Sequence, residues 1–357
     1  MKKLKVLFML IVFSALFVLN TKIVSEAAEL KGAKERFKVN MQNVEKKFKV
    51  HRMQEFHIIG NDLYMTQRFA NNKDEKENDV AIIKFTIANN VASYTAGNYM
   101  IVENSGHGET LDAYTYGKKT YFLIGSKGKD DEDHNYYSHQ IGRVEYKKGT
   151  TIKYTSVRRL TGFDFANQNA VNNGQVQRVA ACSSADIIWF ITFLGKKNAN
   201  NKYQDCIQIS AYALGKVNEA FDDKSTLYTT FEKNESLKGA CKSTKLIWRK
   251  AGVNELPNDS FQGMEAFNAS VCFAGGTEGS SYPEIWCLTG GTWDSKRTLK
   301  SYVNLDNKVV STKNTEIEGL CIKGGELYFG IVNSMSNIHI VSVPLVNISE
   351  WATVSPM

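Results

Sequence analysis

Apolar and polar positions alternate with a period of two through much of the chain, and the clearest example lies near the C-terminus. The segment TEIEGLCIKGGELYFGI (315–331) contains two apolar strands separated by Gly324 and Gly325. A pair of glycines between alternating strands is typical of a β-hairpin, because its turn residues need positive φ. Glu318 lies within the first strand on the same face as Leu320. An ionised carboxylate on a buried face is costly unless it is paired or hydrated.

The same layout of hairpin, polar loop and third strand recurs four more times. Aromatic residues on the second strands of the five copies lie 55 to 84 residues apart, so the copies fill most of the chain. The other hairpins are MQEFHIIGNDLYMTQR (53–68), ETLDAYTYGKKTYFLIG (109–125), VQRVAACSSADIIWFITF (176–193) and FQGMEAFNASVCFAGG (261–276), and the third strands are 80–87, 139–146, 205–214, 284–290 and 337–345.

Further strands are predicted between the copies, at 151–160, 225–231 and 297–305, while 235–252 reads as a helical insertion. Repeated four-stranded sheets around a channel define a β-propeller. We therefore predict an all-β, five-bladed β-propeller of four-stranded blades. A β-sandwich with accidental internal similarity is the alternative architecture.

The N-terminus predicts a signal peptide at 1–27. Lysines precede an apolar run from Val6 to Leu19, and small residues follow at Ala27 and Ala28. The apolar run is too short to span a bilayer, so we expect a secreted, extracellular protein without a stable membrane anchor. Residues 50–357 form the predicted propeller. Residues 28–49 are an N-terminal extension or a ring-closing strand, or an amphipathic helix with its apolar residues on one stripe.

Composition narrows the possible partners and cofactors. The formal net charge is +7, and no basic cluster interleaved with aromatic residues is present, so nucleic acid is not an expected partner. Six cysteines allow up to three disulfides in an exported protein, and Cys272 and Cys287 lie on consecutive predicted strands. Neither the cysteines nor the acidic stretch 130–134 has the spacing of a known metal motif, so we expect no metal and no cofactor. A monomer is expected.

Polar residues interrupt all five predicted innermost strands at similar positions. A propeller strand that is covered on both faces should be nearly continuously apolar, so these residues are expected to line the channel. One interpretation is a hydrated ring that binds the backbone of the next blade. The other is a set of converging carboxylates that cleaves a sugar, as paired acids do in glycosidases. The catalytic candidates are Glu55, Asp112, Glu265 and Glu318, and the accompanying ligand-binding candidates are Gln54, Gln177, Arg178 and Gln262.

The loops between second and third strands are expected to open on one face of the propeller. Loops on a rigid scaffold commonly carry recognition, and tyrosines beside amides suit carbohydrate. The candidates on this face are Tyr136, Tyr137, Tyr203 and Tyr282. His107, just before an innermost strand, is the histidine expected to line the channel. No other catalytic motif, such as GxSxG, HExxH or a P-loop, is present.

The repeated segments resemble the helveticin J family of large, heat-labile bacteriocins. The resemblance rests on TEIEGLCIKGGELYFGIV with NIHIVSVPL, and on the hairpins at 176–193 and 261–276. It implies a five-bladed propeller, an antibacterial role and a cell-surface partner such as a wall glycopolymer. Similar propellers occur in teichoic-acid biosynthesis protein C-like proteins and in phage receptor-binding proteins. The chain departs from the family at Val179, where an acid is expected, so its ring of acids is incomplete.

Three functions follow as hypotheses. The first is a secreted bacteriocin-like protein that binds a cell-envelope glycan of Gram-positive bacteria without enzymatic activity. The second is a propeller glycoside hydrolase that uses the channel carboxylates. The third is an adhesion or scaffold protein that binds a protein partner through the loop face.

Overall fold

The computed structural model describes most of the chain beyond the predicted signal peptide. The described residues are 28–30, 32–49, 52–69, 78–129, 136–197, 203–248, 256–257, 260–276, 283–289, 298–302, 315–334 and 336–353. Residues 1–27, the acidic stretch 130–134 and Tyr282 lie outside them. Among the described residues, no helix is both long and apolar enough to cross a membrane.

Five three-stranded antiparallel units, here called repeats one to five, form the body of the protein. Their strands lie where the alternation predicted hairpins and third strands, and the all-β prediction is confirmed. The repeats are β3 (Met53–Ile59), β4 (Asp62–Phe69) and β5 (Asp79–Ala88); β7 (Leu111–Tyr116), β8 (Lys119–Gly128) and β9 (Ser138–Val144); β12 (Gln175–Ser184), β13 (Ile187–Lys197) and β14 (Tyr203–Ala213); β17 (Gly263–Phe267), β18 (Ser270–Gly275) and β19 (Glu284–Leu288); and β21 (Glu316–Lys323), β22 (Glu326–Ser334) and β23 (Asn337–Pro344).

An outer strand extends each repeat. In the first four repeats it follows in the chain and pairs antiparallel with the third strand: β6 (Val91–Glu103), β11 (Arg158–Thr161), β16 (Cys241–Trp248) and β20 (Thr298–Tyr302). The outer strand of repeat five is β2 (Lys34–Asn40), which comes from the N-terminal segment and pairs antiparallel with β23. The two ends of the described chain therefore share one sheet.

Short strands add to these sheets. β10 (Thr150–Lys153) pairs parallel with β6, and β15 (Tyr228–Thr230) pairs parallel with β11. β1 (Ala28–Glu29) and β24 (Ala352–Thr353) both pair with β20. The prediction that 225–231 forms the fourth strand of repeat three is wrong, because β16 occupies that place.

The predicted helical insertion at 235–252 is only partly helical. Helix α3 (Glu235–Ala240) begins after Asn234, whose side chain accepts a hydrogen bond from the amide of Leu237 at 2.9 Å. The chain then enters β16, where alternating side chains and β-branched residues favour a strand over a longer helix.

The N-terminal segment is not an amphipathic helix. After β2 it contains only the short 3-10 helix η1 (Lys46–Phe48). The apolar residues that suggested a helical stripe are buried all the same. The ring of Phe48 packs edge-on against Phe69 and Tyr99, each at 5.0 Å between ring centroids.

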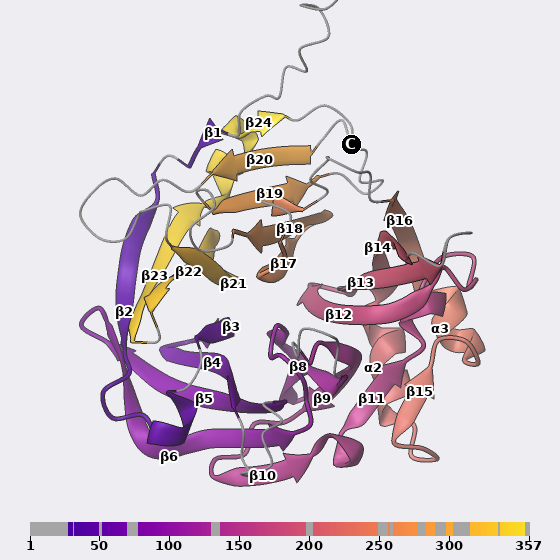
Figure 1. The fold of residues 1–357 in the computed structure, drawn as a ribbon, viewed down its shortest axis with the longest axis horizontal. Coiled ribbons are helices and arrows are strands. Elements are labelled where there is room, and N and C mark those ends of the chain that lie inside the picture. The colour runs from indigo at the N-terminus through magenta and orange to yellow at the C-terminus, as the bar shows by residue number, and fades with distance from the viewer. Residues whose placement is uncertain are drawn as a thin grey trace, which may run out of the picture.

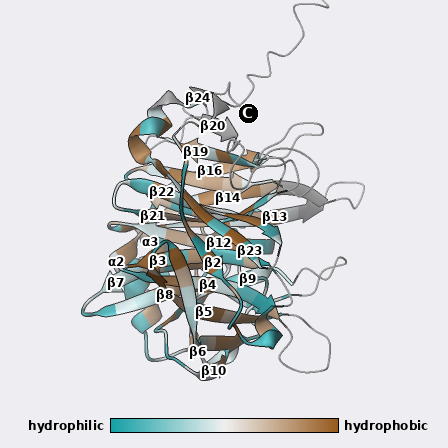
Figure 2. Ribbon diagram, turned by 90° about the vertical axis from the view of Figure 1, so that its left-hand side faces the viewer, coloured by the Kyte–Doolittle hydropathy of each residue, from teal (hydrophilic) through white to brown (hydrophobic). Residues whose placement is uncertain are grey.

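The sheets are arranged in a ring, as Figure 1 shows, with β3, β12, β17 and β21 nearest its centre. The innermost strands contact one another in the cyclic order β3, β7, β12, β17, β21 and back to β3. Five clusters of buried apolar residues fill the spaces between successive repeats, and the cluster of Phe56, Phe85 and Ile340 joins repeat one to repeat five. Figure 2 shows that hydrophobic residues lie mainly along the strands inside the body. The fold is therefore β-propeller-like.

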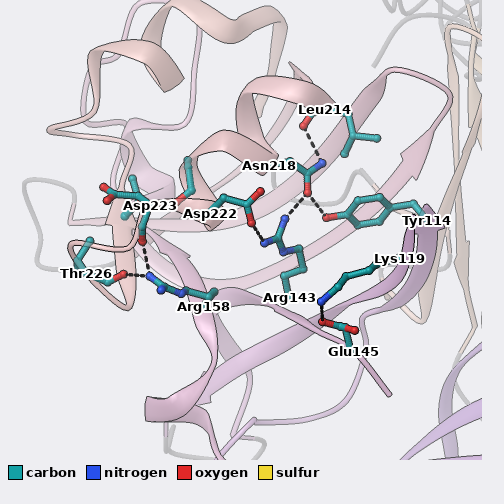
Figure 3. Close-up of polar contacts among 12 residues, drawn as sticks. Tyr114, Lys119, Arg143, Glu145, Arg158, Leu214, Asn218, Asp222, Asp223 and Thr226 are labelled. Carbon is teal, nitrogen blue, oxygen red and sulfur yellow. Dashed lines mark hydrogen bonds and ion pairs between the residues drawn. The ribbon is translucent and has the colours of Figure 1, made fainter. Parts of the chain in front are cut away.

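Helix α2 (Leu214–Asp222) follows repeat three and covers the edge of repeat two. The side chain of Asn218, fully buried, accepts hydrogen bonds from Tyr114 on β7 at 2.7 Å and from Arg143 on β9 at 2.6 Å. Figure 3 shows these three residues together with Asp222, which also pairs with Arg143.

Candidate functional site

Glu55 on β3 is buried where repeats one, four and five meet. Its Oε1 atom accepts hydrogen bonds from the amides of Phe56 and Leu320, each at 2.9 Å. Gly319 lies directly against this carboxylate with φ of +76°, and a Cβ there would overlap Oε1. The carboxylate therefore bonds the backbone of the last repeat. The first interpretation of the ring included such a bond but expected a hydrated group, whereas Glu55 is only 2% exposed.

Glu265 on β17 is held in the same manner. Its Oε1 accepts from the amide of Ala266 at 2.8 Å, and its Oε2 accepts from Ile322 on β21 at 3.2 Å. Burial raises the pKa of Glu265 to about 8, with a further contribution from the Asp112 carboxylate. Burial also raises the pKa of Glu55 well above its usual range, although the two amide donors oppose the shift.

Asp112 on β7 connects repeats one, two and three. Its Oδ1 lies 3.3 Å from Nδ1 of His57 on β3, and its Oδ2 accepts a hydrogen bond from the hydroxyl of Ser183 on β12. Burial by itself would lower the pKa of His57. The Cys321 thiol group and the Asp112 carboxylate outweigh burial, so the pKa lies well above the ordinary value of histidine.

Arg178 on β12 lies closer to the loop face and holds a buried ion pair. Its guanidinium donates to Glu109 at 2.8 Å from Nε and at 2.6 Å from Nη2, a bidentate geometry, and also to the carbonyl of Phe261 at 2.7 Å. Burial raises the pKa of Glu109 to about 7, while Arg178 and Arg68 oppose the shift. These contacts join repeat three to the segment before repeat two and to repeat four.

Aromatic rings cover the same ion pair. The Tyr137 ring centroid lies 4.4 Å from the guanidinium carbon of Arg178, and the His107 ring lies 5.1 Å from Tyr137. Nδ1 of His107 in turn lies 3.1 Å from Arg68. The structure thus brings three of the predicted ligand-binding residues into one group, the mouth cluster, which we define as Arg68, His107, Glu109, Tyr137 and Arg178.

Glu318, the charge in the middle of the apolar strand, is 4% exposed. Burial raises its pKa well above the usual range, Glu316 and Glu109 add to the rise, and Arg52 and Arg178 oppose it. Its carboxylate lies within the electrostatic reach of the mouth cluster. Unlike Glu55 and Glu265, it makes no hydrogen bond to an amide in the described part of the chain.

The remaining predicted residues are distributed around this region. Gln54 is buried and its side-chain amide donates to the carbonyl of Arg52 at 3.2 Å, whereas Gln177 is exposed. Gln262 is half-buried, and its backbone carbonyl accepts a hydrogen bond from the backbone amide of Gly319 at 2.8 Å. Tyr136 is buried with φ of +54°. Tyr203 is the first residue of β14, and its backbone lies opposite Lys197 of β13.

Three β-bulges explain why polar residues change direction at these positions. The register shifts between Met53 and Glu55, between Val176 and Arg178, and between Glu318 and Leu320. A bulge places an extra residue on one strand and redirects the neighbouring side chains, and bulges are frequent beside functional sites. The bulge on β12 leaves Gln177 outside and turns Arg178 inward.

His57, Arg68, Glu109 and Cys321 belong to the site but were not predicted from the sequence. His57 and Cys321 lie on innermost strands beside candidates that were named, so the strand register offered a signal for them. Glu109 opens the predicted hairpin at 109–125 but lies just ahead of β7, so it was not counted among the polar interruptions of the strand. Its pairing with Arg178, 69 residues away, has no local signature.

The fold and this region define a β-propeller-like protein with buried polar groups at its centre. A family model described as bacteriocin helveticin-J matches residues 31–274, well over half of the chain. The chain therefore belongs to the helveticin J family of bacteriocins. No curated protein matches it.

Several solved structures are similar over most of their length. A glycosyl hydrolase from Bacteroides ovatus has a TM-score of 0.41 at 9% identity, covering 90% of this chain and 97% of that one. A glutaminyl cyclase from Myxococcus xanthus has a TM-score of 0.41 at 8% identity, with coverages of 90% and 97%. The GH43_1 enzyme from Xanthomonas citri, complexed with xylose, has a TM-score of 0.42 at 10% identity, with coverages of 86% and 92%. These similarities carry no inference about activity.

Proposed function

We propose that this chain is an exported antibacterial protein of the bacteriocin type, built as a five-bladed propeller, that binds a glycan of the Gram-positive cell envelope. Membership of the helveticin J family is the observation that carries the proposal. The five repeats, the cyclic contacts of their innermost strands and the five clusters between them support the blade number.

The binding surface in this proposal is the mouth cluster. The half-buried rings of Tyr137 and His107 offer flat faces and Arg68 adds a cationic group, while the buried pair of Glu109 and Arg178 supports the rings from beneath. Such a combination suits a sugar polymer with hydroxyl or phosphate groups. The positive formal charge of the chain favours encounter with an anionic wall polymer.

The state of the carboxylates favours binding over catalysis. Glu55 and Glu265 each accept two backbone hydrogen bonds, which fix the sheets and leave neither group poised as a free acid or base. Asp112 is engaged by His57 and Ser183. Three of the four predicted catalytic acids thus have structural partners.

A sedimentation assay with purified Gram-positive cell walls tests the proposal. The protein is expected to co-sediment with the walls, and binding should fall when teichoic acid is stripped from them. Tyr137→Ala should raise the apparent Kd roughly tenfold, as expected for one lost ring contact. Tyr228→Ala is the matched control because Tyr228 is 54% exposed on the outer strand β15. No binding to any wall preparation, or equal binding by both variants, contradicts the proposal.

A glycoside hydrolase is the second candidate, and Glu318 is the observation that favours it. Burial raises the pKa of the Glu318 carboxyl well above its usual range, and a shift in this direction suits a general acid. Release of reducing sugars from wall polysaccharide, abolished in a folded Glu318→Gln variant, would support this function. Activity that persists in the variant would remove it.

A further inference from the structure

A cluster of three different ligand types lies at the centre of the ring, beyond the mouth cluster. His57 on β3, Glu265 on β17 and Cys321 on β21 each offer one donor atom, and these atoms all lie within 4.8 Å of one another. The three strands belong to repeats one, four and five. All three residues are largely buried, and the side chain of His57 retains 13% exposure.

The donor set is that of a thiophilic transition metal. Imidazole nitrogen, carboxylate oxygen and thiolate sulfur are the ligands of zinc sites, whereas calcium and magnesium prefer oxygen alone. Ligand atoms around a tetrahedral zinc lie roughly 3.3–3.8 Å apart. Small side-chain rotations therefore bring the three donors onto one ion.

The surroundings orient the histidine and the carboxylate. Asp112 Oδ1 lies 3.3 Å from His57 Nδ1, and Ser183 donates to the other oxygen of Asp112. The amide of Ala113 donates to Nδ1 at the same distance, a contact that the imidazole exchanges for Asp112 when Nδ1 carries a proton. A proton on Nδ1 shared with Asp112 leaves the Nε2 lone pair available, which is the usual carboxylate–histidine–metal arrangement. The amides of Ala266 and Ile322 fix the carboxylate of Glu265.

We propose that His57, Glu265 and Cys321 form a binding site for a zinc-like divalent cation, with Asp112 as the positioning residue for His57. The cation would link β3, β17 and β21, and so connect the last two repeats to the first. Three protein ligands leave one position for water. This site is independent of the proposed wall binding, because none of its residues belongs to the mouth cluster.

Cobalt(II) is the probe that tests this site, because thiolate coordination gives it a charge-transfer absorption in the near ultraviolet. The purified full-length chain, treated with a chelator and dialysed, should bind a single equivalent with that absorption, and zinc should displace it. Cys321→Ser should lose the absorption. Cys241→Ser is the matched control, since Cys241 carries a free thiol at the start of β16, away from the cluster, and should keep it.

The positioning role of Asp112 has its own readout. Asp112→Asn should keep the cobalt spectrum and lower the affinity about 10- to 100-fold. A chain that binds no cobalt, or a Cys321→Ser variant that keeps the absorption, overturns the proposal. If Cys321→Ser does not fold, Glu265→Gln decides, because it retains the thiolate and should weaken binding. Unchanged affinity in Glu265→Gln would remove that residue from the ligand set and overturn the site as stated.

Discussion

The carboxylate of Glu55 in the first repeat accepts a 2.9 Å hydrogen bond from the amide of Leu320 in the last repeat, 265 residues further along the chain. The neighbouring glycines make this approach possible. Gly319 has φ of +76°, and Gly263 faces it closely enough that a Cβ on Gly263 would lie 2.8 Å from the Cα of Gly319. A buried acid thus joins the two ends of the ring where the backbones of three repeats converge.

Gly319→Ala should therefore destabilise the protein by about 2–4 kcal/mol. The variant combines the strain of a left-handed backbone with overlap between the new methyl group and the Glu55 carboxylate. Chemical denaturation followed by tryptophan fluorescence measures the change. Gly117→Ala is the control, because Gly117 has a similar φ of +64° but no atom within 4 Å of the added Cβ.

The control should lose only about 1–2 kcal/mol, the cost of the backbone conformation alone. The difference between the two variants then reports the contact with Glu55. Equal losses would mean that the carboxylate moves away freely, and that its bond to Leu320 contributes little to the ring.

Asn218→Ala should cost about 2–4 kcal/mol in unfolding free energy. The amide oxygen of Asn218 is shared by the Tyr114 hydroxyl and the Arg143 guanidinium, and its loss leaves two buried donors short of a partner (Figure 3). Thermal and denaturant unfolding measure the effect.

Lys119→Ala is the control for that network because it lies nearby in Figure 3 and breaks an exposed ion pair with Glu145. Exposed ion pairs contribute roughly 0–1 kcal/mol. A loss in Asn218→Ala no larger than that in Lys119→Ala would show that water replaces the amide, and that α2 is held to repeat two by apolar packing alone.

Much of the fold was predictable because its signals are local. Alternation, turn glycines and aromatic residues identify the three inner strands of every repeat, and all fifteen strands overlap the predicted segments, although several extend a few residues beyond them. The outer strands were harder to predict, because their pairing is decided by what lies beside them. The strand β16 continues directly from α3, and β2 finds its partner β23 about 300 residues away in sequence.

For the site, the sequence could predict which strand positions carry polar residues, but not what those residues contact. The alignment of hairpins selected Glu55, Glu265 and Glu318 as polar interruptions expected to line a hydrated channel, whereas the structure buries all three. It could not tell which of them bond the backbone, because a β-bulge changes the direction of a side chain without a clear mark in the sequence. His57 and Cys321 were overlooked for a related reason, since their relation to Glu265 exists only after three distant strands meet.

The bond between Cys272 and Cys287 leads to a prediction about redox sensitivity. The two residues lie opposite each other on β18 and β19, as the sequence suggested, and form a disulfide that closes a loop of 15 residues. A loop of that length contributes about 3 kcal/mol through the unfolded state. The Cys272→Ala/Cys287→Ala variant should lose about that amount and become insensitive to reductant. Cys241→Ala should keep the reductant sensitivity of the parent chain.

The buried pair of Glu109 and Arg178 predicts that stability falls as pH rises. The folded-state pKa of Glu109 is about 7, above the ordinary value of 4.5, so the folded protein binds the extra proton between these values. The stability that this proton contributes is fully present below about pH 4.5 and is lost as the pH rises through 7. The free energy of unfolding therefore falls by about 3 kcal/mol over this range. Arg178 and Arg68 face the Glu109 carboxyl and oppose the rise in its pKa, and the pKa of Glu318 is raised in the same direction as that of Glu109. Glu109→Gln should therefore flatten, without abolishing, the slope of unfolding free energy against pH between pH 5 and 8.

Glu326→Gln is the control. Glu326 forms a more exposed pair with Arg36, so this variant should leave the slope unchanged. Identical slopes in Glu109→Gln and the parent would show that Arg178 keeps Glu109 ionised across this range.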